Sequence, residues 1–215
     1  MLSLQKPYIR VDCAGAASYG GNQMRSDKEI IRKCGCGAVA ALDLILYLTD
    51  DSKTLPLVDY NRELEDLCRR YFPLIPPFGI NGLLLAVGVN RLLLKHRLPY
   101  RAVWVVSGKK LRDRIETQLR RDLPVILSIG PNFPAFWEKH RLQLYTRTPD
   151  GRYYPAASVK AHYITVTGMD ETWLRVASWG KEYYINWDEY CRYVQRHSNS
   201  VVSNMLFLKK HRGFV

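Results

Sequence analysis

The chain has 215 residues, enough for one ordinary domain, and 47% of them are hydrophobic, which excludes an intrinsically disordered protein. Its 32 basic and 20 acidic residues give a net charge of +12, which favours anionic partners. The basic residues are scattered in short pairs and form no block typical of a nucleic-acid-binding tail, so we do not expect a nucleic-acid partner.

Polar residues interrupt both the N-terminal segment and the most apolar stretch, residues 80–94. We therefore expect no secretory signal and no membrane span, and we expect a soluble, cytoplasmic protein.

Helices dominate the first half of the predicted fold. Apolar residues at helical spacing predict helices from Cys36 to about residue 49, then over 60–71, 81–97 and 108–121, with a strand at 102–106. Runs rich in β-branched and aromatic residues predict strands in the second half, at 124–129, 163–167, 173–177, 181–186 and 201–208, with a helix at 188–195. This order is typical of an α+β fold with two lobes and a cleft between them.

The cysteines are odd in number, and their spacing matches neither a disulfide scaffold nor a zinc site: Cys13, Cys34, Cys36, Cys68 and Cys191. Free thiols are therefore expected, and no metal or organic cofactor is implied. Cys34 is interpreted as structural, with a regulatory disulfide to Cys36 as the alternative.

Cys36 is the candidate nucleophile. It starts a helix rich in small residues, where the positive end of the helix dipole stabilises a thiolate and lowers the thiol pKa. His162 opens a predicted strand far downstream, and a cysteine at a helix start facing a histidine on a strand is the arrangement of cysteine nucleophile catalysis. The alternative is that both residues serve only packing.

The segment 35–41 (GCGAVAA) resembles the nucleophile segment of papain-like cysteine peptidases, and is closest to the branch related to peptidases that process bacteriocin (double-glycine) leaders. Residues 115–127, 161–168 (AHYITVTG) and 177–180 (ASWG) resemble later segments of that branch in the same order. The resemblance covers about residues 20 to 190. It implies one papain-like domain over residues 1–215, with a helical lobe over about 20–122 and a β lobe over about 123–215.

The resemblance also implies an oxyanion-hole glutamine upstream of Cys36, for which Gln23 is the candidate. Its side-chain amide and the Cys36 backbone N–H would donate to the developing oxyanion. The separation is larger than the family usually has, and an insertion over residues 24–33 that loops out would keep Gln23 in place. Asn22 is the alternative source of the amide.

The third catalytic position departs from the family pattern, which has Asn or Asp there. One alignment places Ala177 at this position and the other places Ser178. A serine hydroxyl can accept a hydrogen bond from the imidazole and fix its tautomer, but it supplies no charge to stabilise imidazolium.

The remaining polar and aromatic candidates are not expected to take part directly in the chemistry. Asp43 is expected on the surface or as a cap, and Trp179 is expected to shield the site. Phe133 and Trp137 either form a binding wall or pack on the core, and the remaining histidines are expected to face solvent.

These observations predict a cysteine peptidase or amidase that acts on a peptide or protein substrate through a thioester. Cys36 is the expected nucleophile, His162 the general base and acid, Gln23 the oxyanion donor and Ser178 the residue that orients the histidine. The alternatives are a catalytically degenerate module that binds peptides or a partner protein, and an acyltransferase on the same fold.

Overall fold

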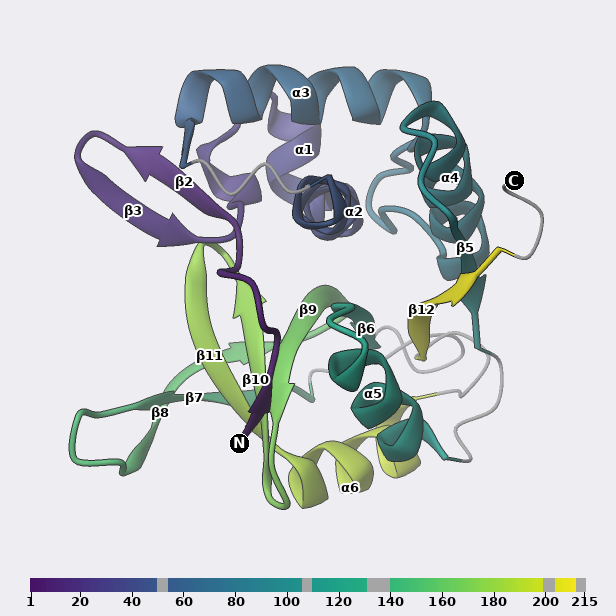
Figure 1. Cartoon of the computed structure of the whole chain (residues 1–215). Coiled ribbons are helices and arrows are strands. Elements are labelled where there is room, and N and C mark those ends of the chain that lie inside the picture. The colour runs from purple at the N-terminus through teal and green to yellow at the C-terminus, as the bar shows by residue number, and fades with distance from the viewer. Residues whose placement is uncertain (50–53, 106–109, 131–139, 199–203, 212–215) are drawn as a thin grey trace.

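The computed structural model describes residues 1–49, 54–105, 110–130, 140–198 and 204–211, and these form an α+β fold (Figure 1). The strands of the main sheet are β1 (Leu2–Ser3), β5 (Tyr100–Trp104), β6 (Val125–Ile129), β7 (Leu142–Arg147), β8 (Tyr153–Val159), β9 (His162–Met169), β10 (Trp173–Ser178), β11 (Lys181–Asn186) and β12 (Met205–Lys210). They form a nine-stranded sheet with the order β5-β12-β6-β9-β10-β11-β7-β8, and β1 pairs with β9. The printed pairings in this sheet are antiparallel.

A second, smaller sheet has the order β3-β2-β4 and consists of β2 (Arg10–Cys13), β3 (Ala16–Tyr19) and β4 (Leu55–Pro56). The hairpin of β2 and β3 projects from the body of the molecule (Figure 1).

The helical elements are η1 (Gln23–Arg25), α1 (Glu29–Cys34), α2 (Cys36–Leu48), α3 (Leu57–Arg70), α4 (Gly82–Lys95), α5 (Leu111–Arg120) and α6 (Trp187–His197). Helix α2 lies at the centre of the molecule and contacts α3, α4 and strand β9 (Figure 1). It therefore joins the helical part of the fold to the middle of the main sheet.

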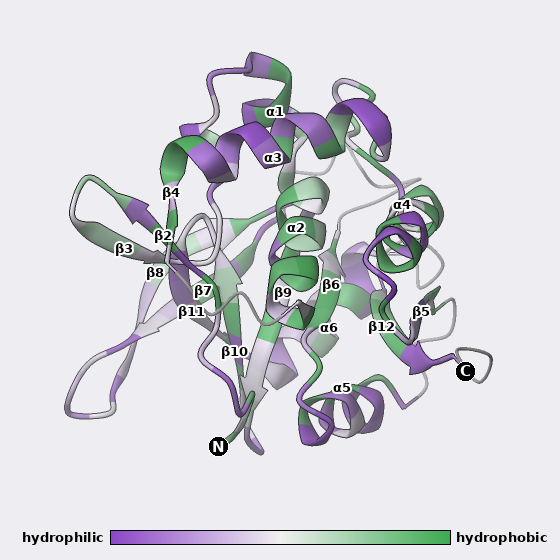
Figure 2. Cartoon of the chain, turned by 45° about the horizontal axis from the view of Figure 1, so that its top comes forward, coloured by the Kyte–Doolittle hydropathy of each residue, from purple (hydrophilic) through white to green (hydrophobic). Residues whose placement is uncertain are grey.

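Helix α2 occupies this central place because its sequence is apolar on nearly every side. Every residue from Gly37 to Tyr47 is buried, and the helix is coloured hydrophobic along most of its length in Figure 2. A helix that is apolar all round is stable only inside a core. The surrounding helix α3 is amphipathic instead and buries residues such as Tyr60 and Leu64 on one face.

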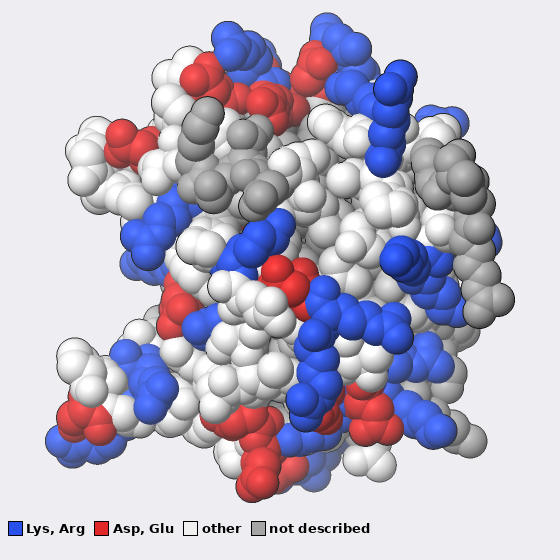
Figure 3. All heavy atoms as spheres, viewed as in Figure 1, with Lys and Arg blue, Asp and Glu red and all other residues white. Residues whose placement is uncertain are grey.

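Lysine and arginine side chains are spread among acidic ones over the face seen in Figure 3, in agreement with their scatter along the sequence. Within the described part of the chain, none of the helices combines the length and the apolar character needed to cross a bilayer.

Within the described residues, the predicted helices and strands are confirmed in type and order, with shifts of a few residues at their ends. Residues 106, 108–109 and 201–203 of the predicted elements lie outside the described residues. The predicted helix from Cys36 starts and ends as expected. The sequence reading missed the hairpin of β2 and β3 and the hairpin of β7 and β8. Residues 24–33, which were expected to loop out and keep Gln23 in place, contain parts of the short helices η1 and α1.

Candidate active site

A small cavity of about 10 Å³ lies where α2, β9 and β10 meet the segment that precedes η1. All four predicted site residues line it: Gln23, Cys36, His162 and Ser178. They come from four places in the sequence, so the fold brings them together. The cavity admits no more than a water-sized group in this conformation.

Cys36 is the first residue of α2, and the short break at Gly35 separates it from α1. The residue as a whole is half-buried, but its thiol is enclosed and receives a hydrogen bond from the backbone N–H of Tyr163, the residue after His162. Gly37 permits close packing at this point, because a Cβ there would lie 2.7 Å from Ile80. The helix start therefore places the sulfur directly against the beginning of β9.

The ionisation of the Cys36 thiol and the His162 imidazole differs from the expectation drawn from the sequence. Burial raises the pKa of the Cys36 thiol, although backbone N–H groups of Tyr163 and Gly37 act in the opposite direction. Burial also lowers the pKa of His162 to about 4. The predicted lowering of the thiol pKa is therefore wrong, since desolvation outweighs the helix start, and burial favours a neutral thiol beside a neutral imidazole.

His162 and Ser178 are hydrogen-bonded to each other. The His162 Nε2 atom lies 2.8 Å from the Ser178 hydroxyl oxygen, and both residues are buried. This contact leaves Nδ1 as the ring nitrogen for other partners, and it fixes the plane of the ring. Of the two alternatives for the third position, Ser178 contacts the imidazole, whereas Ala177 lies beside Gly20.

Trp179 covers the imidazole from one side. Its ring stacks on that of His162 with 4.7 Å between the centroids. Trp179 and Gly180 form the two-residue connection between β10 and β11, with φ values of 50° and 72°. Positive φ at both positions is typical of a type I′ hairpin turn and is strained for a bulky residue. The turn thus holds the indole over His162, where Trp179 was expected to shield the site.

Gln23 and Asn22 have different surroundings. The Gln23 side chain is buried, lines the cavity and donates from Nε2 to the Arg32 carbonyl oxygen over 2.8 Å. An amide nitrogen carries two hydrogens, so one remains for another acceptor. The Asn22 side chain does not line the cavity and instead caps η1 by accepting from the Met24 N–H. Of the two amides, only that of Gln23 borders the cavity.

Asp43 also lines the cavity, and the expectation that it is a surface or capping residue is wrong. Only 3% of its surface is exposed, and its carboxylate accepts from the Gly21 N–H and from the hydroxyls of Tyr8 and Tyr60. Burial raises its pKa to about 6, which these three donors partly offset. The sequence did contain a signal for this buried position. Asp43 is the one charged residue in an otherwise apolar helix, and a carboxylate buried in such a helix requires hydrogen-bond partners.

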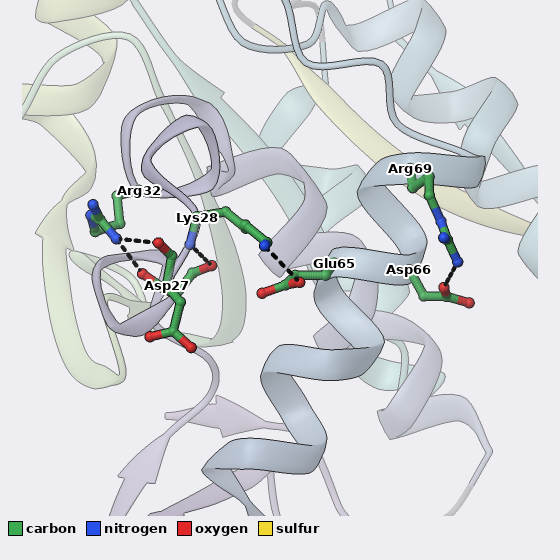
Figure 4. Close-up of polar contacts among 7 residues, drawn as sticks. Asp27, Lys28, Arg32, Glu65, Asp66 and Arg69 are labelled. Atoms are coloured by element: carbon green, nitrogen blue, oxygen red, sulfur yellow. Dashed lines mark hydrogen bonds and ion pairs between the residues drawn. The ribbon is translucent and has the colours of Figure 1, made fainter.

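The segment from η1 to α1 is anchored from both sides. Arg32 Nη1 donates to the carbonyl oxygens of Ser26 and Asp27 over 2.7 and 2.9 Å, and Lys28 lies 4.0 Å from Glu65 on α3 (Figure 4). Asn61, also on α3, donates to the Arg25 carbonyl oxygen. A groove of about 880 Å³ lies between this segment and α3 and is lined by Asp27, Lys28 and Glu65 among others, so the segment borders both this groove and the small cavity.

The other predicted residues lie elsewhere. Cys34 is buried, and no disulfide links it to Cys36. His96, His140 and His211 are exposed as expected, whereas His197 is half-buried and stacks on His140. Phe133 and Trp137 lie outside the described residues.

Comparisons with known proteins give a distant structural likeness. No family model and no curated protein matches the sequence. Among solved structures, the chain is similar to a candidate C39-like peptidase from Bacillus anthracis, with 13% sequence identity and a TM-score of 0.48. The superposition covers 89% of this chain and 94% of the other.

Proposed function

We propose that the protein is a cysteine peptidase or amidase with a papain-like, two-lobed fold, and that it hydrolyses a peptide or amide bond through Cys36. The observation that supports this most directly is the shared cavity of Cys36 and His162, in which Ser178 occupies one nitrogen of the imidazole. The ordered sequence motifs further support a relationship to the bacterial peptidases that process bacteriocin leaders.

The reaction starts from the neutral pair. The Cys36 sulfur attacks the substrate carbonyl carbon while His162 takes the thiol proton, and the oxyanion accepts from the Cys36 backbone N–H and the Gln23 amide. His162 then protonates the departing amine, which leaves a thioester. Water attacks the thioester with His162 as base, which releases a carboxylic acid and restores the thiol.

The neutral starting state follows from the burial of both groups. Ser178 contacts Nε2 of His162 but supplies no negative charge that would favour imidazolium before substrate binds. Proton transfer from Cys36 to His162 is therefore expected to accompany attack on the carbonyl rather than to precede it.

A second candidate function is a peptide-binding module that has lost catalysis. Two observations favour it. The cavity is small. In addition, the pKa of the Cys36 thiol is raised and that of His162 is lowered, and these two shifts disfavour a thiolate–imidazolium pair. Hydrolysis of a peptide library separates the two functions.

The library experiment compares the parent with Cys36→Ala, His162→Ala and Cys191→Ala. The peptidase proposal expects cleavage by the parent and by Cys191→Ala, whose thiol is exposed and outside the cavity, and none by the other two. Retained peptide binding with no cleavage by any of them would establish the binding module instead.

A further inference from the structure

The carboxylate of Asp43 lies directly beneath the chain that leads to Gln23. The Gly21 nitrogen is 3.0 Å from Oδ2 and 3.2 Å from Oδ1 of Asp43, and the Tyr60 hydroxyl donates to Oδ1 over 2.7 Å. The Tyr8 hydroxyl lies 3.3 Å from Oδ2. Residues from three separate segments thus converge on one buried carboxylate.

The chain passes so close to this carboxylate that side chains are excluded. A Cβ on Gly20, whose φ is +78°, would lie 2.6 Å from Asp43 Oδ2, and a Cβ on Gly21 would lie 1.8 Å from the Tyr60 hydroxyl oxygen. Glycine at both positions therefore lets the backbone reach the acceptor. The glycine-rich stretch therefore brings the backbone into close contact with Asp43 and Tyr60, in addition to forming a turn.

Asp43 and Cys36 belong to one rigid element, since Asp43 lies two turns further along α2. Gln23 follows Gly21 by two residues, and its amide is held from the other side by the Arg32 carbonyl oxygen. A bond from α2 to Gly21 consequently fixes the distance between the nucleophile helix and the Gln23 side chain.

We propose that Asp43 is a positioning residue for the oxyanion hole: its carboxylate holds Gly21 so that the Gln23 amide meets the oxyanion formed at Cys36. This inference rests on the proposed peptidase function. Asp43 itself touches no reacting atom in this account and acts through Gly21.

The contacts of the Asp43 carboxylate are expected to depend on pH. Asp43 has a pKa of about 6, and protonation converts one acceptor oxygen into a donor. Among the described residues, the titratable groups that face or adjoin the carboxylate are the Tyr8 and Tyr60 hydroxyls, together with Cys36, His162 and Tyr163 in the same cavity. Below the pKa, Gly21 and the two tyrosines compete for fewer acceptor sites, and the Gln23 segment loosens.

Two thiol reagents test the positioning. Iodoacetamide alkylates Cys36 without forming an oxyanion, whereas a peptide aldehyde forms a hemithioacetal whose oxygen requires the oxyanion hole. Asp43→Asn is expected to weaken aldehyde binding about tenfold or more while leaving the rate of Cys36 alkylation unchanged. Asp122→Asn is the matched control, because Asp122 also accepts from a tyrosine hydroxyl and a backbone N–H but lies outside the cavity.

A nuclear magnetic resonance titration of the Gly21 backbone amide and the Gln23 side-chain amide gives a readout that needs no catalysis. Both resonances are expected to shift with a midpoint near pH 6 in the parent and in Asp122→Asn, and not in Asp43→Asn. Aldehyde binding by Asp43→Asn equal to that of the parent, or equal loss of alkylation and aldehyde binding, would overturn the inference. If the parent itself binds no aldehyde, the proposed function fails and the oxyanion role of Asp43 fails with it. The titration then tests only whether Asp43 holds Gly21 and the Gln23 side chain, and a parent without the transition overturns that contact as well.

Discussion

The Ser178 hydroxyl lies 2.8 Å from Nε2 of His162, and both residues line the small cavity that Cys36 also borders. The contact is buried, and Trp179 stacks against the same ring. A neutral hydroxyl fixes the orientation of the ring without adding charge. The site is therefore built to hold His162 in place while leaving it neutral.

Replacing Ser178 tests this orientation. Ser178→Ala should lower kcat about tenfold, since one neutral hydrogen bond contributes about 0.5–1.5 kcal/mol. Ser178→Asp should raise kcat above that of Ser178→Ala, because a carboxylate both orients the ring and stabilises imidazolium. Turnover of a cleaved library peptide measures both effects. Equal kcat for the parent and both variants would show that Ser178 takes no part in catalysis.

Substitutions of the neighbouring residues Gln23 and Asn22 should affect different properties of the protein. Gln23→Ala should lower kcat by about 10²-fold or more, since the Gln23 amide borders the cavity and an oxyanion donor has that effect in other enzymes. Asn22→Ala should instead lower the free energy of unfolding by about 1 kcal/mol through loss of the η1 cap and leave kcat unchanged. Steady-state kinetics and urea unfolding measure the pair, and a larger kcat loss for Asn22→Ala would assign the oxyanion amide to Asn22.

Several parts of this site followed from short-range patterns. The helix start at Cys36 and the strand that begins at His162 are local features, and the contact between His162 and Ser178 follows from the antiparallel pairing of the neighbouring strands β9 and β10. The place of Asp43 could not be predicted in the same way, because its partners Gly21, Tyr8 and Tyr60 lie 22, 35 and 17 residues away.

The hairpin of β7 and β8 is a different case, because its signal was present. Residues 142–144 alternate between apolar and polar types, the β-forming residues Tyr145 and Thr146 follow, and Asp150-Gly151 is a typical turn sequence. The raised thiol pKa of Cys36 was beyond local reasoning, since the helix start alone predicts a lowered one and the burial that opposes it comes from β9 and other packed elements.

Burial of neutral His162 should make stability depend on pH. Its pKa is about 4 in the folded chain and 6.5 when exposed, so the unfolded state binds more protons between these values. The contribution of neutral His162 to the free energy of unfolding is fully present above pH 6.5, and it is lost as the pH is lowered towards 4. The loss attributable to His162 amounts to about 3 kcal/mol.

Urea unfolding of the parent and of His162→Gln at several pH values isolates this contribution, because Asp43 titrates in both proteins. The difference in stability between them should narrow or reverse in favour of the variant as the pH falls from 6.5 to 4. His140→Gln, at an exposed histidine, should follow the parent. A constant difference between parent and His162→Gln across this range would contradict the buried, neutral state of His162.

Labelling with a peptidyl electrophile tests whether Cys36 is a nucleophile assisted by His162. The parent is treated with a limiting amount of the reagent, and mass spectrometry of the digested protein locates the modified cysteine. We expect Cys36 to be modified ahead of Cys13, Cys34, Cys68 and the exposed Cys191, and His162→Ala to slow the modification of Cys36 alone. Preferential modification of Cys191, with Cys36 unreactive and indifferent to the loss of His162, would contradict the account.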